Sequence, residues 1–236
     1  MTGAPRPSDS SLVTPEARVW VRRVGEPVAL LLGRLGLSPN GLTLLGFAIT
    51  LVAAALAGAQ LWLAAGIVGL LGGVFDLFDG SLARATGRVS RIGAFLDSVF
   101  DRWGEAVMYL GIVIGSVRAG FGLGAALAAF AMGSAFLVSY TRAKAEGLGF
   151  TRGTGMAEVG LAPREVRLVI LALGLVVSGL AGGVETAGGG GRLGFGLTDG
   201  QLWLALALGA IGILSTITTI QRIIHVMGQT VDTDGK

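Results

Sequence analysis

Six long apolar segments, separated by short polar or glycine-rich stretches, dominate the pattern of hydrophobic and polar positions. The segments cover residues 40–59, 61–84, 91–117, 121–145, 164–182 and 200–225. Each is close to the ~20 residues that a helix needs to cross the hydrocarbon core of a bilayer. Ser38-Pro39-Asn40 resembles a helix start, because serine caps a helix and proline fits its first position. The pattern predicts an all-α integral membrane protein with six transmembrane helices.

The N-terminal region has a different pattern. Residues 1–13 are rich in proline and serine, and Thr14-Pro15 is typical of a helix start. The stretch that follows mixes arginines with Val, Leu and Trp, which favours an interfacial amphipathic helix bent near Pro27; an ordinary juxtamembrane helix is the alternative. We therefore expect an N-terminal tail with this amphipathic helix (1–36), a six-helix membrane domain (37–228) and a C-terminal tail (229–236).

Composition agrees with a membrane protein. The 236 residues are 52% hydrophobic and only 14% charged, whereas a soluble domain carries about 25% charged residues. The mean hydropathy is +0.73. The chain contains no cysteine, which excludes disulfides. The first thirty-six residues do not have the pattern of a cleavable signal peptide.

The distribution of charge predicts an orientation. Basic residues concentrate in the N-terminal region, at the turn near 85–90, around 142–167 and at the C-terminal end, with Arg118 and Arg192 as exceptions. The positive-inside rule then places these regions and both termini on the cytoplasmic face of the cell membrane. Trp62 and Trp203 begin helices at the opposite face, either as interfacial aromatics or as packing residues.

Four aspartates interrupt two of the apolar segments: Asp76, Asp79, Asp97 and Asp101. Spacings of three and four residues place each pair on one face of a helix. Carboxylates within a membrane segment are costly and mark a functional site by default, and four of them require cations nearby. Oxygen ligands without Cys or His favour a hard ion such as Mg²⁺, Mn²⁺ or Ca²⁺. Helix capping or pairing with arginines is the structural alternative.

The same stretch resembles the signature of the CDP-alcohol phosphotransferase family. It reads Asp76-x-x-Asp79-Gly80-x-x-Ala83-Arg84, eight residues, then Gly93-x-x-x-Asp97-x-x-x-Asp101. The resemblance implies transfer of a phosphatidyl-type group from a CDP-linked lipid such as CDP-diacylglycerol, with release of CMP. It also implies a homodimer, and glycines in the third and fourth segments could serve helix packing (Gly111, Gly115, Gly120, Gly122, Gly124 and Gly133).

The resemblance also assigns roles to individual residues. By this resemblance, Asp76, Asp79 and Asp97 would be ligands of two Mg²⁺ or Mn²⁺ ions, and Asp101 would be the general base as well as a metal ligand. The nucleotide pocket would be lined by Gly80, Ala83, Arg84 and Gly93, with Asn40 and Thr43 as further candidates.

A second basic group comes from three other helix ends. The chain reads Ser139-Tyr140-Thr141-Arg142-Ala143-Lys144-Ala145-Glu146, then Pro163-Arg164-Glu165-Val166-Arg167, and later Gln221-Arg222. Physical reasoning leaves two interpretations open: a second phosphate site, or charge that sets topology and attracts anionic lipid. These runs resemble those of bacterial phosphatidylinositol-phosphate synthases, which implies that Arg142, Arg167 and Arg222 bind the phosphate of an inositol-phosphate acceptor. This chain departs from that subgroup in having Arg142 in place of a lysine and a longer 147–163 loop.

Several alternatives remain at this level. Glycerol 3-phosphate, or less readily serine, could be the acceptor. A divalent-cation transporter would also place acids inside a helical bundle, and a lipid-binding scaffold would tolerate their loss. Glu105 lies one turn beyond Asp101 and could support a metal ligand or pair with Arg102 or another helix. No nucleic-acid partner is expected.

Overall fold

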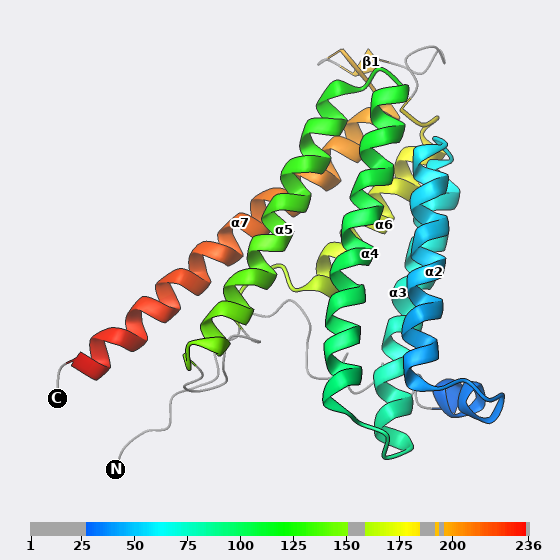
Figure 1. The fold of residues 1–236 in the computed structure, drawn as a ribbon. Coiled ribbons are helices and arrows are strands. Elements are labelled where there is room, and N and C mark those ends of the chain that lie inside the picture. Colours follow the sequence, from blue (N-terminus) through cyan, green and yellow to red (C-terminus); the bar gives the residue numbers. More distant parts are fainter. Residues whose placement is uncertain (1–26, 151–158, 185–191, 194–195, 235–236) are drawn as a thin grey trace.

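Six helices make up most of the computed structural model, which describes residues 27–150, 159–184, 192–193 and 196–234. The helices are α2 (Pro39–Gly58), α3 (Trp62–Ala85), α4 (Arg91–Arg118), α5 (Gly122–Gly147), α6 (Arg164–Leu180) and α7 (Asp199–Asp234). Their positions agree closely with the six predicted segments (Figure 1). Residues 27–34 are also helical. The rest of the predicted N-terminal amphipathic helix lies outside the described residues.

The helices on either side of the aspartate motif begin at serine caps. Ser38 Oγ accepts a hydrogen bond from the Gly41 amide at 3.1 Å, and Pro39 occupies the first turn of α2. Ser90 Oγ accepts from the Gly93 amide at 2.9 Å at the start of α4. The turn between α3 and α4 contains Gly87 at φ 67°, a backbone conformation that favours glycine. These local signals fix where α4 begins and therefore how its aspartates face α3.

Four of the helices are long and apolar enough to cross a membrane: α2, α3, α5 and Asp199–Gln229 of α7. The other two differ for distinct reasons. α4 carries Asp97, Asp101, Arg102 and Glu105 within one stretch, so its hydropathy is low. α6 has 17 residues, about 26 Å at ~1.5 Å per residue, slightly less than the ~30 Å hydrocarbon core. The fold is therefore that of an all-helical membrane protein with four such spans.

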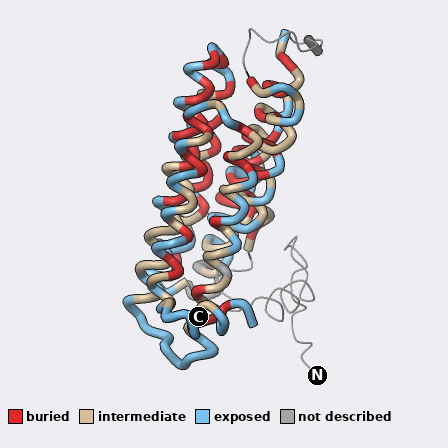
Figure 2. Tube along the Cα trace, turned by 90° about the vertical axis from the view of Figure 1, so that its right-hand side faces the viewer, coloured by how far each residue is buried: buried red, intermediate tan, exposed pale blue. Residues whose placement is uncertain are grey.

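The bundle has two halves that are joined by α6 and by direct packing of α4 on α5. α2 packs on α3 and α4, α5 packs on α7, and α6 contacts both α3 and α7 (Figure 1). Figure 2 shows buried positions along the inner faces of the helices and exposed positions along their outer faces. Many exposed positions are large and apolar, for example Leu110, Leu173 and Ile213. Such an outer surface suits a lipid environment.

Glycines allow α2 and α4 to approach closely within one chain. A Cβ added at Gly111 would collide with the backbone of Ala54, and one added at Gly115 would collide with the Ala57 carbonyl and the Trp62 ring. Gly122 and Gly133, in contrast, face open space. Two of the glycines that could have served a dimer therefore serve intramolecular packing.

Replacing Gly111 with leucine should consequently destabilise the protein. The new side chain would force α2 away from α4 or shift the backbone, and overpacking of this kind costs about 1–3 kcal/mol or more. We expect a lower melting temperature in detergent. Gly209→Leu in α7 is the matched control, because a Cβ added there meets no neighbouring atom among the described residues, and it should leave the melting temperature nearly unchanged. Equal melting temperatures for the two variants would contradict this packing.

Three details differ from the sequence-based expectation. α7 continues to Asp234, well beyond the predicted end near residue 225. Arg192–Leu193 and Leu197–Thr198 form a short antiparallel pair of strands, β1 and β2, in a stretch predicted to be a loop. Trp62 is buried at 2% exposure and is a packing residue, whereas Trp203 is 47% exposed, as an interfacial aromatic would be.

Candidate functional site

The four aspartates of the motif lie near one another on facing parts of α3 and α4. Asp79 interacts electrostatically with Asp97 and Asp76. Asp101 interacts in the same way with Asp97 and Asp76. The predicted convergence of the four carboxylates is therefore present as a single cluster of acidic charge.

The start of α2 forms one wall of this cluster. Thr43 Oγ1 donates a hydrogen bond to Asp79 Oδ2 at 2.5 Å. Asp76 lies directly against Gly46, where an added Cβ would be 2.6 Å from Asp76 Oδ1. A Cβ added at Gly93 would be 3.3 Å from Asn40 Oδ1. Three helices thus meet here, and both α2 candidates, Asn40 and Thr43, lie beside the motif.

The remaining predicted nucleotide residues follow along α3. Gly80 lies close to the guanidinium of Arg84, since a Cβ there would be 3.2 Å from Arg84 Nη1. Arg84 is exposed, and its Nη2 donates to Ser81 Oγ at 3.3 Å. Ala83 is half-buried. Arg84 therefore has a side chain that a phosphate could reach.

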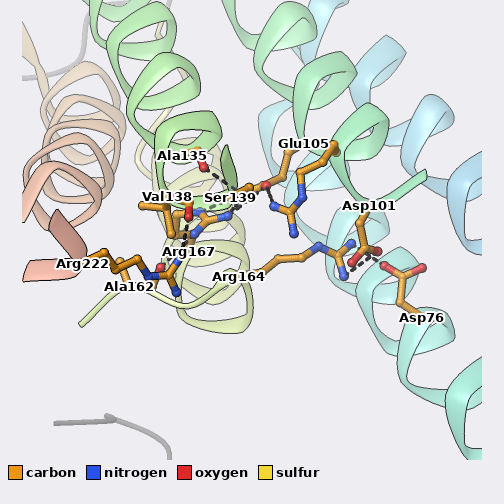
Figure 3. A network of polar contacts seen from close by, with 11 residues as sticks. Asp76, Asp101, Glu105, Ala135, Val138, Ser139, Ala162, Arg164, Arg167 and Arg222 are labelled. Carbon is orange, nitrogen blue, oxygen red and sulfur yellow. Dashed lines mark hydrogen bonds and ion pairs between the residues drawn. The ribbon is translucent and has the colours of Figure 1, made fainter. Parts of the chain in front are cut away.

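Arg164, at the first turn of α6, extends between the two helices of the motif (Figure 3). Its Nη2 lies 2.6 Å from Asp76 Oδ2, and its Nη1 lies 2.8 Å from Asp101 Oδ1. The side-chain exposures are 21% for Arg164, 14% for Asp76 and 16% for Asp101. One guanidinium therefore joins an aspartate of α3 to an aspartate of α4. Nothing in the sequence pattern had predicted a role for Arg164 in the aspartate site.

The donor set fits a hard divalent cation. Asp76, Asp79, Asp97 and Asp101 offer only oxygen ligands, as Mg²⁺ and Mn²⁺ prefer. A cationic group already lies between Asp76 and Asp101, where positive charge is needed. Among the described residues, no group of three or more His, Cys, Asp or Glu side chains is arranged to hold a metal ion. The residues fit the ion, and the present arrangement neutralises the acidic charge with arginine instead.

Glu105 joins the aspartate site to the second basic group. Arg167 Nη2 donates to both carboxylate oxygens of Glu105, at 2.8 and 2.9 Å, and Arg167 Nε donates at 2.9 Å. Arg102 Nη1 donates to Glu105 Oε2 at 2.5 Å. Arg167 is 2% exposed and also donates to the Ala162 carbonyl at 2.8 Å. Of the roles left open for Glu105, pairing with Arg102 and with a residue of another helix both occur.

Arg222 and Arg142 complete the basic group. Arg222 donates to the backbone carbonyl of Val138, which ties α7 to α5 (Figure 3). It also donates to the carbonyl of Val159, in the segment before α6. Its charge interacts with those of Arg142 and Arg167. Arg142 is half-exposed and pairs with Glu146 at 2.9 Å. The three predicted arginines therefore lie near one another, but each already has a partner in the protein.

A small cavity of about 50 Å³ extends from these charged groups into the bundle. Asp76, Glu105, Arg164 and Arg167 line its polar part. The rest is apolar and is lined by side chains of α4 and α6, including Met108, Leu171 and Leu175. The charged groups therefore border a low-dielectric interior, which strengthens their interactions.

Residues 36–211 match the family model for CDP-alcohol phosphatidyltransferases. The match includes the whole aspartate motif and covers well over half of the chain. The chain belongs to the CDP-alcohol phosphatidyltransferase family. The predicted family resemblance is thereby confirmed, and the transporter and scaffold alternatives lose their support.

Two individual relatives are similar to this chain over two thirds of its length or more. A phosphatidylinositol phosphate synthase of Streptomyces avermitilis is 35% identical over 225 residues, which cover 92% of this chain and 84% of the relative. An archaetidylinositol phosphate synthase of Pyrococcus horikoshii is 35% identical over 161 residues, 68% of this chain and 79% of the relative.

A solved structure is similar in fold. The phosphatidylinositol phosphate synthase of Mycobacterium tuberculosis, with CDP-DAG bound, has a TM-score of 0.69 and 27% sequence identity. The similarity covers 86% of this chain and 94% of that one. The same enzyme has also been solved in complex with manganese and citrate, again with a TM-score of 0.69.

Proposed function

We propose that this protein transfers a phosphatidyl group from CDP-diacylglycerol to a hydroxyl group of inositol phosphate and releases CMP. The observation that carries the proposal is the position of the basic group beside the family's aspartate cluster, with Glu105 and Arg164 between them. The names of the relatives from Streptomyces and Pyrococcus support the choice of acceptor. The CDP-DAG complex of the Mycobacterium enzyme supports the choice of donor.

All six helices would cross the cell membrane in this proposal, with the aspartate site near the cytoplasmic face. The short length of α6 and the charges on α4 are compatible with six membrane spans. The polar start of α6 and the charged part of α4 lie beside each other inside the bundle. The acyl chains of the donor would then remain in lipid while its diphosphate reaches the polar site. A homodimer is part of the proposal and rests on the family resemblance.

The donor's nucleotide would lie between the start of α2 and the motif. Asn40 and Thr43 border Gly93 and Asp79 there, and the exposed guanidinium of Arg84 is within reach of a phosphate. Gly80 and Gly93 keep the backbone accessible, since neither carries a side chain that would fill this space. Ala83 would complete the lining.

The acceptor's phosphate would be bound by Arg142, Arg167 and Arg222. Arg142 is half-exposed and needs only to leave Glu146, whereas Arg167 would share or exchange its contact with Glu105. A phosphomonoester carries close to two negative charges and accepts paired hydrogen bonds from guanidinium groups. Glycerol 3-phosphate has the same phosphate chemistry and is the second candidate acceptor.

Asp101 would be the general base. It would take the proton of the acceptor hydroxyl as that oxygen bonds to the β-phosphorus, and the bond from this phosphorus to the CMP oxygen would break. Asp101 lies beside Arg164 on the face of α4 that also carries Glu105, between the donor and acceptor sides. Its position is therefore suited to a hydroxyl held by the basic group.

Asp76, Asp79, Asp97 and Asp101 would hold Mg²⁺ or Mn²⁺, and we propose two ions. When bound, such ions neutralise the diphosphate and the leaving CMP. The manganese complex of the Mycobacterium enzyme supports a divalent metal. The protein's own contribution is to hold four carboxylates together and to orient the phosphates with arginines.

Removing divalent metal should abolish activity. We expect no CMP release from CDP-diacylglycerol and inositol phosphate in detergent after treatment with EDTA. Excess Mg²⁺ or Mn²⁺ should restore it, because four carboxylates cannot hold a diphosphate without cations between them. Full activity in metal-free buffer would contradict the proposed metal site, and lack of CMP release under every metal condition would contradict the proposed reaction.

A further inference from the structure

Arg164 occupies the place in the acidic cluster where a cation is required. Its guanidinium bridges Asp76 of α3 and Asp101 of α4 at 2.6 and 2.8 Å. Both carboxylates belong to the proposed set of metal ligands. A divalent ion that contacts both of them therefore has to replace these ion pairs.

The bridge gives both carboxylates an ion-pair partner but leaves one N–H donor of Arg164 without a partner among the described residues. Arg164 Nε is buried and has no hydrogen-bond partner among the described residues. A guanidinium with a buried donor left unpaired loses part of the stabilisation that the ion pair provides. Besides Asp76 and Asp101, Asp97 and Glu105 also interact electrostatically with Arg164, and Glu105 already binds Arg102 and Arg167.

We propose that Arg164 is a built-in counter-ion that holds the acidic site together before metal binds and competes with the metal for Asp76 and Asp101. The inference rests on the proposed function insofar as this site binds a divalent metal. In the metal-free protein Arg164 joins α6 to α3 and α4. Metal binding displaces its guanidinium from the two aspartates, so part of the metal's binding energy is used to break the bridge.

The competition predicts a gain of metal affinity when the arginine is removed. In Arg164→Gln the metal no longer displaces a charge, so Mn²⁺ should bind on the order of tenfold more tightly. Arg164→Lys keeps the charge but cannot form two parallel contacts, so its affinity should lie between the two. Arg91→Gln removes one exposed positive charge from the start of α4 and is the matched control, expected to bind like the unchanged protein.

The bridge also predicts that the effect of Arg164→Gln on stability depends on whether metal is bound. In EDTA, Arg164→Gln should melt at a lower temperature than the unchanged protein, because the acidic charges of α3 and α4 then repel each other. Saturating Mn²⁺ should remove most of this difference, because the ion replaces the missing counter-ion.

The experiment is a titration of the purified full-length protein with Mn²⁺ by calorimetry, after removal of metal and without donor or acceptor. Thermal unfolding is measured in parallel. Tighter Mn²⁺ binding by Arg164→Gln, with Arg164→Lys between it and the unchanged protein, supports competition. Equal or weaker binding by Arg164→Gln overturns it, and should that variant not fold, equal or weaker binding by Arg164→Lys does so.

The titration separates this inference from the proposed function. If the unchanged protein binds no Mn²⁺, the proposed metal site and the counter-ion role both fail. If the unchanged protein binds Mn²⁺ and the Arg164 variants do not bind it more tightly, the metal site stands and the counter-ion role fails. The identity of the acceptor does not affect either outcome.

Discussion

Asp101→Asn should nearly abolish turnover while CDP-diacylglycerol still binds. An amide at this position cannot accept the proton of the attacking hydroxyl, and loss of a general base lowers rates on the order of 10²–10⁴-fold. The measurement is CMP release under saturating donor and acceptor, together with a direct titration of CDP-diacylglycerol. The affinity for the donor should change little, since Asp76, Asp79 and Asp97 remain.

Asp199→Asn provides the control. Asp199 lies in the first turn of α7, next to the β1–β2 strands and far from the turn between α3 and α4 (Figure 1). The turnover of the Asp199→Asn variant should match that of the unchanged protein. Near-normal turnover of Asp101→Asn would remove the base role. Joint loss of donor binding and metal binding would make Asp101 mainly a metal ligand.

Replacing Arg142, Arg167 or Arg222 with glutamine should raise the KM of the acceptor and leave that of the donor nearly unchanged. Each charge-assisted hydrogen bond to phosphate contributes about 1.5–3 kcal/mol, which corresponds to roughly a ten- to hundredfold change. The test is a pair of titrations on each variant, one with inositol phosphate and one with CDP-diacylglycerol. Equal weakening of both substrates would assign the basic group to the donor or to the membrane surface.

The three variants should differ in stability. Arg142 is half-exposed and, within the part of the chain that the structure describes, forms its ion pair with Glu146 at the surface. Arg142→Gln should therefore fold normally and gives the cleanest test. Arg167→Gln leaves Glu105 with fewer partners, and Arg222→Gln leaves the carbonyls of Val138 and Val159 without their donor. Both should lower the melting temperature. Arg118→Gln, at the other end of α4, is the control that should change neither KM.

The sequence predicted the helices well because local signals mark their ends. Ser38-Pro39 and Ser90 form the expected helix starts, and the apolar segments have the length of membrane spans. The number of spans was harder to predict. Asp97, Asp101 and Glu105 lower the hydropathy of α4, although this helix also has a buried face. The β1–β2 pair lay in a glycine-rich stretch whose composition indicates a loop.

For the site, spacing was sufficient to group the aspartates, because residues three and four apart share a helix face. Thr43, a candidate for the nucleotide pocket, donates a hydrogen bond to Asp79, and its role in binding a nucleotide stays a prediction. The partners of the charges could not be predicted, because Arg164 and Glu105 meet residues that are far away in sequence and lie on other helices. A possible signal was the position of Arg164 three residues before Arg167, on the same face of α6.

The central claim is transfer of the phosphatidyl group to a phosphorylated polyol, and an acceptor screen tests it most directly. Labelled CDP-diacylglycerol is incubated with the purified protein and Mg²⁺ in the presence of inositol phosphate, glycerol 3-phosphate, unphosphorylated inositol or serine, and the labelled lipid products are separated. We predict that inositol phosphate gives the main product, glycerol 3-phosphate at most a minor one, and the two unphosphorylated acceptors none. Equal use of inositol or serine would contradict the proposed phosphate site, and with it the proposed function.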